Sequence, residues 1–325
     1  MADLPDDLVY IIVSYLDLNT NLKIARYINT QFYEACTREQ FWKHLSLEGF
    51  KTKAINGLIR SHGHMFHYLN VSKLRFGRQS TRLLSKLQQL LVLDLKYVYS
   101  NSLLDDRFCY LISKSNLKVL LLGRSTITDI GLSTLKRLQL KELELRHNNL
   151  ITKRGIKQMK HWKGLQTLTF VSVVGVYFIH QLATLQLKHF TISFCHNLDI
   201  HSVNTFCNIP NKQMTRFLLY GVPLKHNMIK ALAHNCPNIE IFALCHPSCG
   251  QPEYNSLRYM KKINILSVIC CRTIFNFKFL RDINVRVFFI CRTKLHTHGS
   301  PYGFKDFVKD LKNCRLKPIS TIPYT

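Results

Sequence analysis

The stretch from Leu140 to Leu150 constrains the fold of this chain more than any other. Its sequence, LKELELRHNNL, fits the pattern L-x-x-L-x-L-x-x-N-x-L at all five specified positions. Alternate side chains of a short β-strand share one face, so Leu143 and Leu145 are predicted to point together into a core. Asn148 stands where the chain must turn, and its amide can satisfy backbone groups of a neighbouring coil. One such coil cannot bury its own leucines, so it needs copies stacked on both sides.

Copies of this pattern recur with a mean period of about 24 residues, within the range of leucine-rich repeats. Equivalent strand starts, each followed by apolar residues three and five positions later, occur at Val71, Leu90, Leu117, Leu165, Leu187, Met214, Ile239, Ile263 and Val285. Segments 127–138 and 151–162 match each other as helices of successive coils would. We therefore predict an α/β solenoid of about ten repeats over residues 71–298, with parallel strands on its concave face and helices on its convex face.

Cysteines at fixed repeat positions refine the subtype. Cys195 and Cys271 occupy the turn position that Asn148 holds in its own coil, and Cys236 precedes the strand start at Ile239 by three residues. This arrangement resembles the cysteine-containing class of leucine-rich repeats, which is often found in F-box proteins.

Composition points to a folded protein that works inside the cell. A chain of 325 residues with 46% hydrophobic content is far from the composition of disordered proteins. The acidic amino terminus lacks the basic region of a secretory signal, and the longest apolar run, 170–179, is about half of the roughly 20 residues that a membrane span needs. An odd number of cysteines, 11, fits a reducing compartment. We expect a cytoplasmic or nuclear location and no membrane partner.

The first 45 residues read as a separate helical unit. Leu8, Ile11, Ile12, Tyr15 and Leu16 form one stripe of an amphipathic helix. A second helix is expected to carry Leu22, Ala25, Ile28 and Phe32 inward, and a third, after the capping-box spacing at Thr37, to carry Phe41, Trp42 and Leu45.

Residues 4–45 resemble an F-box. The segment opens with Leu4-Pro5, as the family does, and closes with the family's pattern of an aromatic residue, Trp, Lys, any residue and Leu at positions 41–45. The apolar residues of the first expected helix also match, while Phe32 stands where the family usually has Trp. F-boxes dock onto a Skp-type adaptor that connects them to a cullin ubiquitin ligase. The resemblance implies adaptor contacts from Leu4, Pro5, Leu8, Ile11, Ile12, Leu16, Leu22, Ile28, Phe32 and Trp42.

These observations predict four regions. Residues 1–48 form the F-box, 49–70 a junction and degenerate first coil, 71–298 the solenoid, and 299–325 a capping helix and tail. A helical subdomain that merely closes the first coil remains an alternative for the amino-terminal region, because repeat arrays need end caps.

No catalytic or metal-binding motif stands out in the sequence. The Ser elbow, the phosphate-binding loop and the dinucleotide-binding glycine motif are all missing. Neither His62-x-His64-x-x-His67 nor Cys245-His246-x-x-Cys249 comes with a clear second pair of ligands, so surface histidines and core or turn cysteines are the simpler interpretations. We expect no cofactor, no metal and no enzymatic activity of the chain's own.

The positive charge is concentrated after residue 50. Of 45 Lys and Arg residues only four lie in the first 50 positions, which hold seven of the 19 acidic residues. The basic residues are dispersed over nearly every coil, which leaves open a solvated convex face, an acidic protein partner and, least favoured, nucleic acid.

The strand pattern predicts which side chains face a partner. Positions two, four and six after each strand start project onto the concave sheet, where we expect the substrate-binding residues Lys73, Arg75, Lys96, Arg146, Arg216, Leu218 and Tyr220. The face changes from charged to apolar beyond Leu218, so Arg216, Leu218 and Tyr220 are predicted to begin an apolar patch. Alternatively, the carboxyl-terminal segment covers Ile241, Ile265 and Val287.

Together these features predict the substrate-recognition subunit of a Skp-cullin-F-box ubiquitin ligase, which binds a protein substrate on its concave face. The alternative is a leucine-rich-repeat scaffold that works outside a ligase, with nucleic acid or acidic partners.

Overall fold

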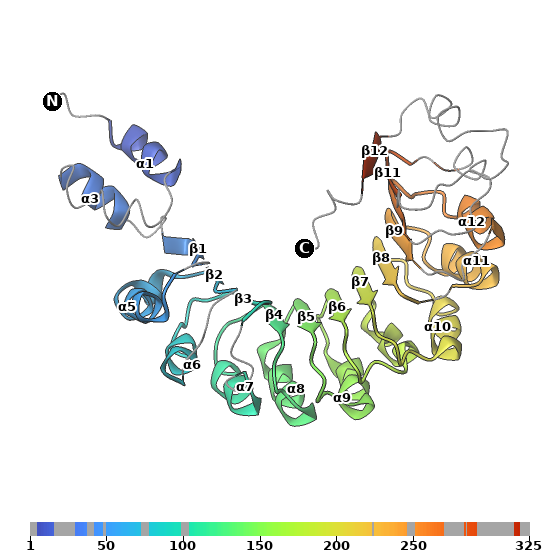
Figure 1. Ribbon diagram of the computed structural model, residues 1–325, viewed down its shortest axis with the longest axis horizontal. Coiled ribbons are helices and arrows are strands. Elements are labelled where there is room, and N and C mark those ends of the chain that lie inside the picture. The colour runs from blue at the N-terminus through green and yellow to red at the C-terminus, as the bar shows by residue number, and fades with distance from the viewer. Residues whose placement is uncertain are drawn as a thin grey trace.

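The computed structural model of the chain is a curved ladder of strands with helices along its outer side (Figure 1). The structure describes residues 5–15, 30–37, 42–47, 50–72, 78–98, 104–222, 224–245, 251–269, 283, 285–290 and 315–318. Strands line the inner, concave side of the arc and helices the outer, convex side. This is the leucine-rich-repeat solenoid that the sequence predicts.

One parallel sheet runs the length of the solenoid. Each strand pairs with the next in sequence order from β1 to β12, as coils stacked one upon another require. The strands are β1 (His44–Ser46), β2 (Tyr68–Asn70), β3 (Val92–Leu95), β4 (Val119–Gly123), β5 (Glu142–Arg146), β6 (Thr167–Val171), β7 (His189–Ser193), β8 (Arg216–Tyr220), β9 (Ile241–Cys245), β10 (Ile265–Ile269), β11 (Val287–Ile290) and β12 (Arg315–Pro318).

The core consists of the strand positions that the repeat pattern assigns to it. Leu93, Leu120, Leu143 and Leu168, which pair with one another across β3 to β6, are all fully buried. The same core continues through a row of phenylalanines from Phe190 onward, including pairs of rings on adjacent strands. Adjacent coils therefore bury one another's leucines, as predicted.

Short helices return the chain from one strand to the next along the convex side. Among the described residues, the α-helices of the solenoid are α5 (Thr52–His62), α6 (Arg78–Leu84), α7 (Asp106–Ile112), α8 (Asp129–Leu135), α9 (Lys153–Gln158), α10 (Ile200–Cys207), α11 (His226–Asn235) and α12 (Gln251–Ser256), and α1 (Asp6–Tyr15) and α3 (Thr30–Thr37) precede the first strand. The 3₁₀-helices are η1 (Gly63–Met65), η3 (Lys136–Leu138), η4 (Met159–His161), η5 (Ile179–Leu185) and η6 (Leu257–Tyr259). The segments 127–138 and 151–162 are helical as predicted.

Asn148 differs from its expected role. It is fully buried, but its amide nitrogen donates to the hydroxyl of Ser125 at the same position of the preceding coil, rather than to a backbone carbonyl. Other asparagines make the expected hydrogen bonds to backbone carbonyl groups of the preceding coil. The amide nitrogen of Asn211 donates to the Leu187 carbonyl oxygen at 2.9 Å, and that of Asn235 donates to the Cys207 carbonyl oxygen at 3.1 Å. Both of these asparagines precede a strand, whereas Asn197, which follows β7, donates to the Val174 carbonyl oxygen at 3.3 Å, so asparagines link coils through the backbone on both sides of the strands.

The first coil of the solenoid begins earlier than the sequence suggested. Of the expected third helix, Trp42 and Lys43 are helical and residues 38–41 lie outside the described residues, while Leu45 lies in β1 and pairs with Leu69 of β2. Trp42 therefore occupies the strand-start position of this coil, where it is 1% exposed in the solenoid core. Its ring stacks on that of His62, with centroids 3.9 Å apart, and lies 6.3 Å from the ring of Phe66, the equivalent position one coil later.

The register of the second coil also corrects the sequence analysis. The predicted strand start at Val71 is wrong, because β2 is Tyr68–Asn70 and Leu69 pairs with Leu93. The strand start is Phe66, which places Leu69 and Val71 at the two buried positions.

The ladder also extends beyond the expected end of the solenoid. β11 pairs in parallel with β12, so a strand lies within the region predicted to form a capping helix and tail. The expected helix around Phe304, Phe307 and Leu311 lies outside the described residues. In the part of the chain that the structure describes, no helix has the length and apolar character to cross a membrane.

Candidate functional site

Two surfaces carry the residues singled out from the sequence, and the first is the outer face of α1. This helix packs against α3 through Val9 and Val13, which are fully buried with Ala35. The opposite face carries Leu8, Ile11, Ile12 and Tyr15, which are 47%, 48%, 40% and 86% exposed. Because large apolar side chains in a row on one helix are costly to leave in water, this face is suited to contact another protein.

The α1–α3 pair lies beyond the first strand, at the amino-terminal end of the arc (Figure 1). Asp6 at the start of α1 accepts a hydrogen bond from the side-chain amide of Gln31 on α3 at 2.9 Å. The apolar core between α1 and α3 is separate from the core of the solenoid. The buried side chains of α1 and α3 therefore pack against each other and not in the core of the solenoid, while the outer face of α1 is exposed.

The predicted adaptor-binding residues divide into three groups. Pro5, Leu8, Ile11 and Ile12 are exposed together on or beside α1, while Phe32 is half-buried against its inner face. Trp42 is buried in the solenoid core, so its side chain offers almost no surface to a partner. The other predicted residues, Leu4, Leu16, Leu22 and Ile28, lie outside the described residues.

The second surface is the concave face of the sheet, where three rows of side chains run across the strands. The first row includes Glu142, Thr167, His189 and Arg216, which lie at matching positions on β5 to β8. The Thr167 hydroxyl and the Nδ1 atom of His189 are 3.2 Å apart, within hydrogen-bond distance. A carboxylate, a hydroxyl, an imidazole and a guanidinium thus stand side by side on neighbouring strands.

Charges in this row influence one another. Burial and then the Glu144 charge raise the pKa of Glu142, against the opposing effects of Lys96 and Arg216. Burial, and then the charges of Arg216 and Lys188, lower the pKa of His189. The Nε atom of Arg216 is buried and has no hydrogen-bond partner among the described residues.

Ion pairs between residues two positions apart in the chain occupy the amino-terminal part of this face. Lys96 Nζ lies 3.4 Å from the carboxylate of Asp94, and Arg146 pairs with Glu144. The Arg146 guanidinium also lies 5.7 Å from the ring centroid of Tyr97, which is 41% exposed. Lys96 and Arg146 therefore face the concave side as predicted, but each charge already has an acidic neighbour.

The apolar patch predicted beyond Leu218 is less accessible than expected. Leu218 is 6% exposed and its neighbour Ala243 is fully buried. Tyr220, Ile241 and Ile265 are half-buried and supply the accessible apolar surface here. Of the polar row from Glu142 to Arg216, the choice of individual residues included Arg216 alone, although the alternating strand pattern places all its members on the concave face.

Lys73 and Arg75 cannot be placed on this face. Both lie outside the described residues, and the observed register gives the concave positions of β2 to Tyr68 and Asn70. Nor do the described residues contain a group of three or more His, Cys, Asp or Glu side chains able to hold a metal ion. His62 of the histidine-rich segment stacks on Trp42, and His246 and Cys249 lie outside the described residues.

Comparison with protein-family models gives no match, and comparison with curated proteins gives none either. Among solved structures, a chain of the Rad7 and Elc1 complex from yeast is similar, with a TM-score of 0.60 and 11% sequence identity. The similarity covers 96% of this chain and 92% of that one, and at this identity it is a likeness of fold alone.

Two internalins from Listeria monocytogenes are similar at a lower level. Internalin InlF has a TM-score of 0.49 and 14% identity, over 97% of this chain and 92% of its own. Internalin C2 has a TM-score of 0.44 and 16% identity, over 82% of this chain and 98% of its own.

Proposed function

We propose that this chain is the substrate-recognition subunit of a Skp-cullin-F-box ubiquitin ligase. The observation that carries the proposal is the apolar outer face of α1, formed by Leu8, Ile11, Ile12 and Tyr15. Three of these residues, Leu8, Ile11 and Ile12, are among those through which the F-box resemblance implies adaptor binding. The similarity in fold to a chain solved in a two-protein complex, that of Rad7 and Elc1, is consistent with an adaptor partner.

The concave face would hold the substrate in this proposal. Its polar row, Glu142, Thr167, His189 and Arg216, offers both donors and acceptors, and the half-buried Tyr220 and Ile241 add apolar contact area. Tyr and Arg are the side chains most often found as interface anchors. A substrate held on these strands would meet the conjugating enzyme at a raised effective concentration, so the chain would act by proximity.

A double variant of α1 tests adaptor binding. Leu8→Asp/Ile12→Asp should reduce affinity for a Skp-type adaptor about a hundredfold or more, since each buried apolar anchor commonly contributes over a factor of ten. Ile130→Asp/Leu150→Asp is the matched control, because these solenoid side chains are 70% and 51% exposed. Affinity measured with the purified full chain should fall only for the α1 variant, with the thermal unfolding temperature of both variants close to wild type.

The scaffold alternative is favoured by one observation, the formal net charge of +26. A chain acting outside a ligase would co-purify from cells without adaptor or cullin, and its retention on nucleic acid would fall steeply with salt. Absence of adaptor and cullin from the wild-type preparation would contradict the ligase proposal. Their presence in wild type and loss in the α1 variant would support it.

Substrate capture requires a separate variant. Arg216→Glu reverses the charge at the end of the polar row and should remove one set of co-purifying proteins while adaptor and cullin are retained. Lys153→Glu makes the same charge change at an exposed position on α9 and serves as the control.

A further inference from the structure

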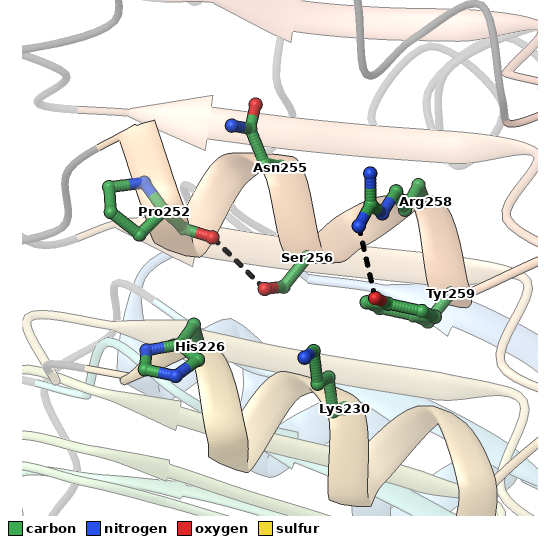
Figure 2. Close-up of a pocket in the computed structure, with 7 residues that line it drawn as sticks. All are labelled: His226, Lys230, Pro252, Asn255, Ser256, Arg258 and Tyr259. Atoms are coloured by element: carbon green, nitrogen blue, oxygen red, sulfur yellow. Dashed lines mark hydrogen bonds between the residues drawn. The ribbon is translucent and has the colours of Figure 1, made fainter.

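A small pocket lies on the convex side, away from both surfaces described above. It has a volume of about 220 Å³ and opens between α11 and the segment formed by α12 and η6 (Figure 2). The described residues that line it are His226, Lys230, Pro252, Asn255, Ser256, Arg258 and Tyr259. No acidic side chain is among them.

Two cationic side chains converge on one phenol in this pocket. Lys230 Nζ lies 5.2 Å and the Arg258 guanidinium carbon 5.1 Å from the ring centroid of Tyr259. Arg258 Nη2 also donates a hydrogen bond to the Tyr259 hydroxyl oxygen at 3.1 Å. That hydrogen bond, with the charges of Arg258 and Lys230, lowers the pKa of Tyr259. The positive charges of Lys230 and Arg258 therefore favour a negative charge close to the Tyr259 hydroxyl group.

Two further polar side chains of the pocket, His226 and Ser256, differ in what they can offer a ligand. His226 precedes Lys230 by four residues on α11, so the two side chains project from the same face of that helix. The Ser256 hydroxyl donates to the Pro252 carbonyl oxygen at 2.9 Å, as Figure 2 shows, so its hydrogen is used within α12. Donors for a ligand thus come from Lys230, Arg258, Tyr259 and His226.

We propose that this pocket binds an oxyanion of the phosphate type, either free phosphate or the phosphoryl group of a phosphorylated side chain. The planar guanidinium of Arg258 suits two oxygens of one phosphoryl group, and Lys230 supplies a second, compact positive charge. The pocket volume is several times the roughly 30 Å³ that one water molecule occupies in the liquid, which leaves room for such a group. An anion between the two cations would also offset their mutual repulsion.

The test is a titration of the purified full chain with inorganic phosphate and, separately, with a phosphoserine peptide and its unphosphorylated form. The pocket variant is Lys230→Gln/Arg258→Gln, and Lys153→Gln/Lys157→Gln removes two charges from exposed positions on α9. Lys230→Gln alone provides a milder change at an exposed site, and the thermal unfolding temperature checks that each variant is folded.

The expected result is saturable binding to wild type and to the α9 variant, with affinity about tenfold or more weaker in the pocket variant, since one charge-assisted hydrogen bond is worth at least that factor. Tighter binding of the phosphopeptide than of free phosphate identifies a phosphorylated segment as the ligand, and the reverse order identifies the free anion. Two results overturn the proposal: no saturable binding of either probe to wild type, or an equal loss in the α9 variant, which would assign binding to the general basic surface. Neither of these two results depends on the adaptor or on the concave face. The test of the pocket is therefore independent of the test of the ligase function.

Discussion

The carboxylate of Asp106 accepts hydrogen bonds from both the backbone N–H and the hydroxyl of Thr128, at 2.8 and 2.6 Å. Thr128 is the residue that caps α8, so the side chain of one coil fixes the start of the helix in the next. Asp106 also accepts from the N–H of Gly131 at 3.0 Å. One coil later, Asp129 binds the backbone N–H and hydroxyl of Thr152 at the same two distances. A carboxylate–threonine link thus joins consecutive coils on the convex side.

Loss of this link should destabilise the solenoid. Asp106→Ala removes three hydrogen bonds to a carboxylate and is expected to lower the free energy of unfolding by about 1.5–3 kcal/mol. Urea denaturation followed by circular dichroism measures the change. Arg107→Ala, at the exposed next position, should have little effect, and an equal effect of the two variants would show that the link contributes nothing.

Two glycines should respond to alanine in opposite directions. A Cβ at Gly123 would lie 1.6 Å from the carbonyl oxygen of Lys96 in the preceding coil, so Gly123→Ala should destabilise by about 1–3 kcal/mol or more. A Cβ at Gly57, in the middle of α5, would meet no atom within 4 Å. Gly57→Ala should therefore stabilise by about 0.5–1 kcal/mol, because alanine favours the helix. Thermal and urea unfolding of both variants test this, and a destabilised Gly57→Ala would contradict it.

Trp42 provides a test of where the amino-terminal helical unit ends and the solenoid begins. Trp42→Leu leaves a cavity among Trp42's neighbours in the first coil, and should lower the free energy of unfolding by about 2–5 kcal/mol. Adaptor affinity, measured where both proteins are folded, should stay close to wild type. If Trp42 contacts the adaptor instead, affinity would fall while stability changed little.

The same tryptophan shows where sequence reasoning reached its limit. Apolar residues at 66, 69, 71, 74 and 76 fit the strand pattern in two phases, and pattern alone does not choose between Phe66 and Val71 as the start. Phe66 lies 24 residues before Leu90, the usual period, whereas Val71 lies 19 before it. Trp42 lies 24 residues before Phe66, so the same period also marks Trp42 and Leu45 as the opening of a coil.

Other features followed directly from the repeat. Burial of Leu143 and Leu145 and the concave placement of Arg146 and Arg216 follow from strand alternation alone. The near-complete burial of Leu218 does not, because strand alternation assigns Leu218 to the concave face without fixing how much of its side chain is exposed there. The Lys230–Arg258 pocket brings together two helices of successive coils, a contact that no local motif announces.

Four buried cysteines should be chemically inert in the folded chain. Burial raises the pKa of Cys195 and of Cys236 to about 11 and that of Cys207 to about 12, and it also raises the pKa of Cys109. At pH 8 these thiols are therefore protonated and poorly nucleophilic. Mass spectrometry after iodoacetamide treatment should find these four positions unmodified in the native chain and modified in urea. Rapid native labelling of any of them would contradict their burial.

These raised pKa values also set a direction for pH dependence. The unfolded thiols ionise near pH 8.5, whereas the buried ones resist ionisation to about pH 11 or beyond. The contribution of these thiols to the free energy of unfolding is therefore fully present below pH 8.5. It is lost as the pH rises from about 8.5 to about 11, because ionisation then favours the unfolded chain.

The most direct measurement of the proposed function is hydrogen–deuterium exchange of the full chain with and without a Skp-type adaptor. The proposal predicts protection in peptides covering α1, where the apolar face would be buried, and unchanged exchange in β5 to β8, which must stay open to a substrate. Protection of the concave strands without protection of α1, or no protection anywhere at adaptor concentrations that saturate a known F-box protein, would contradict it.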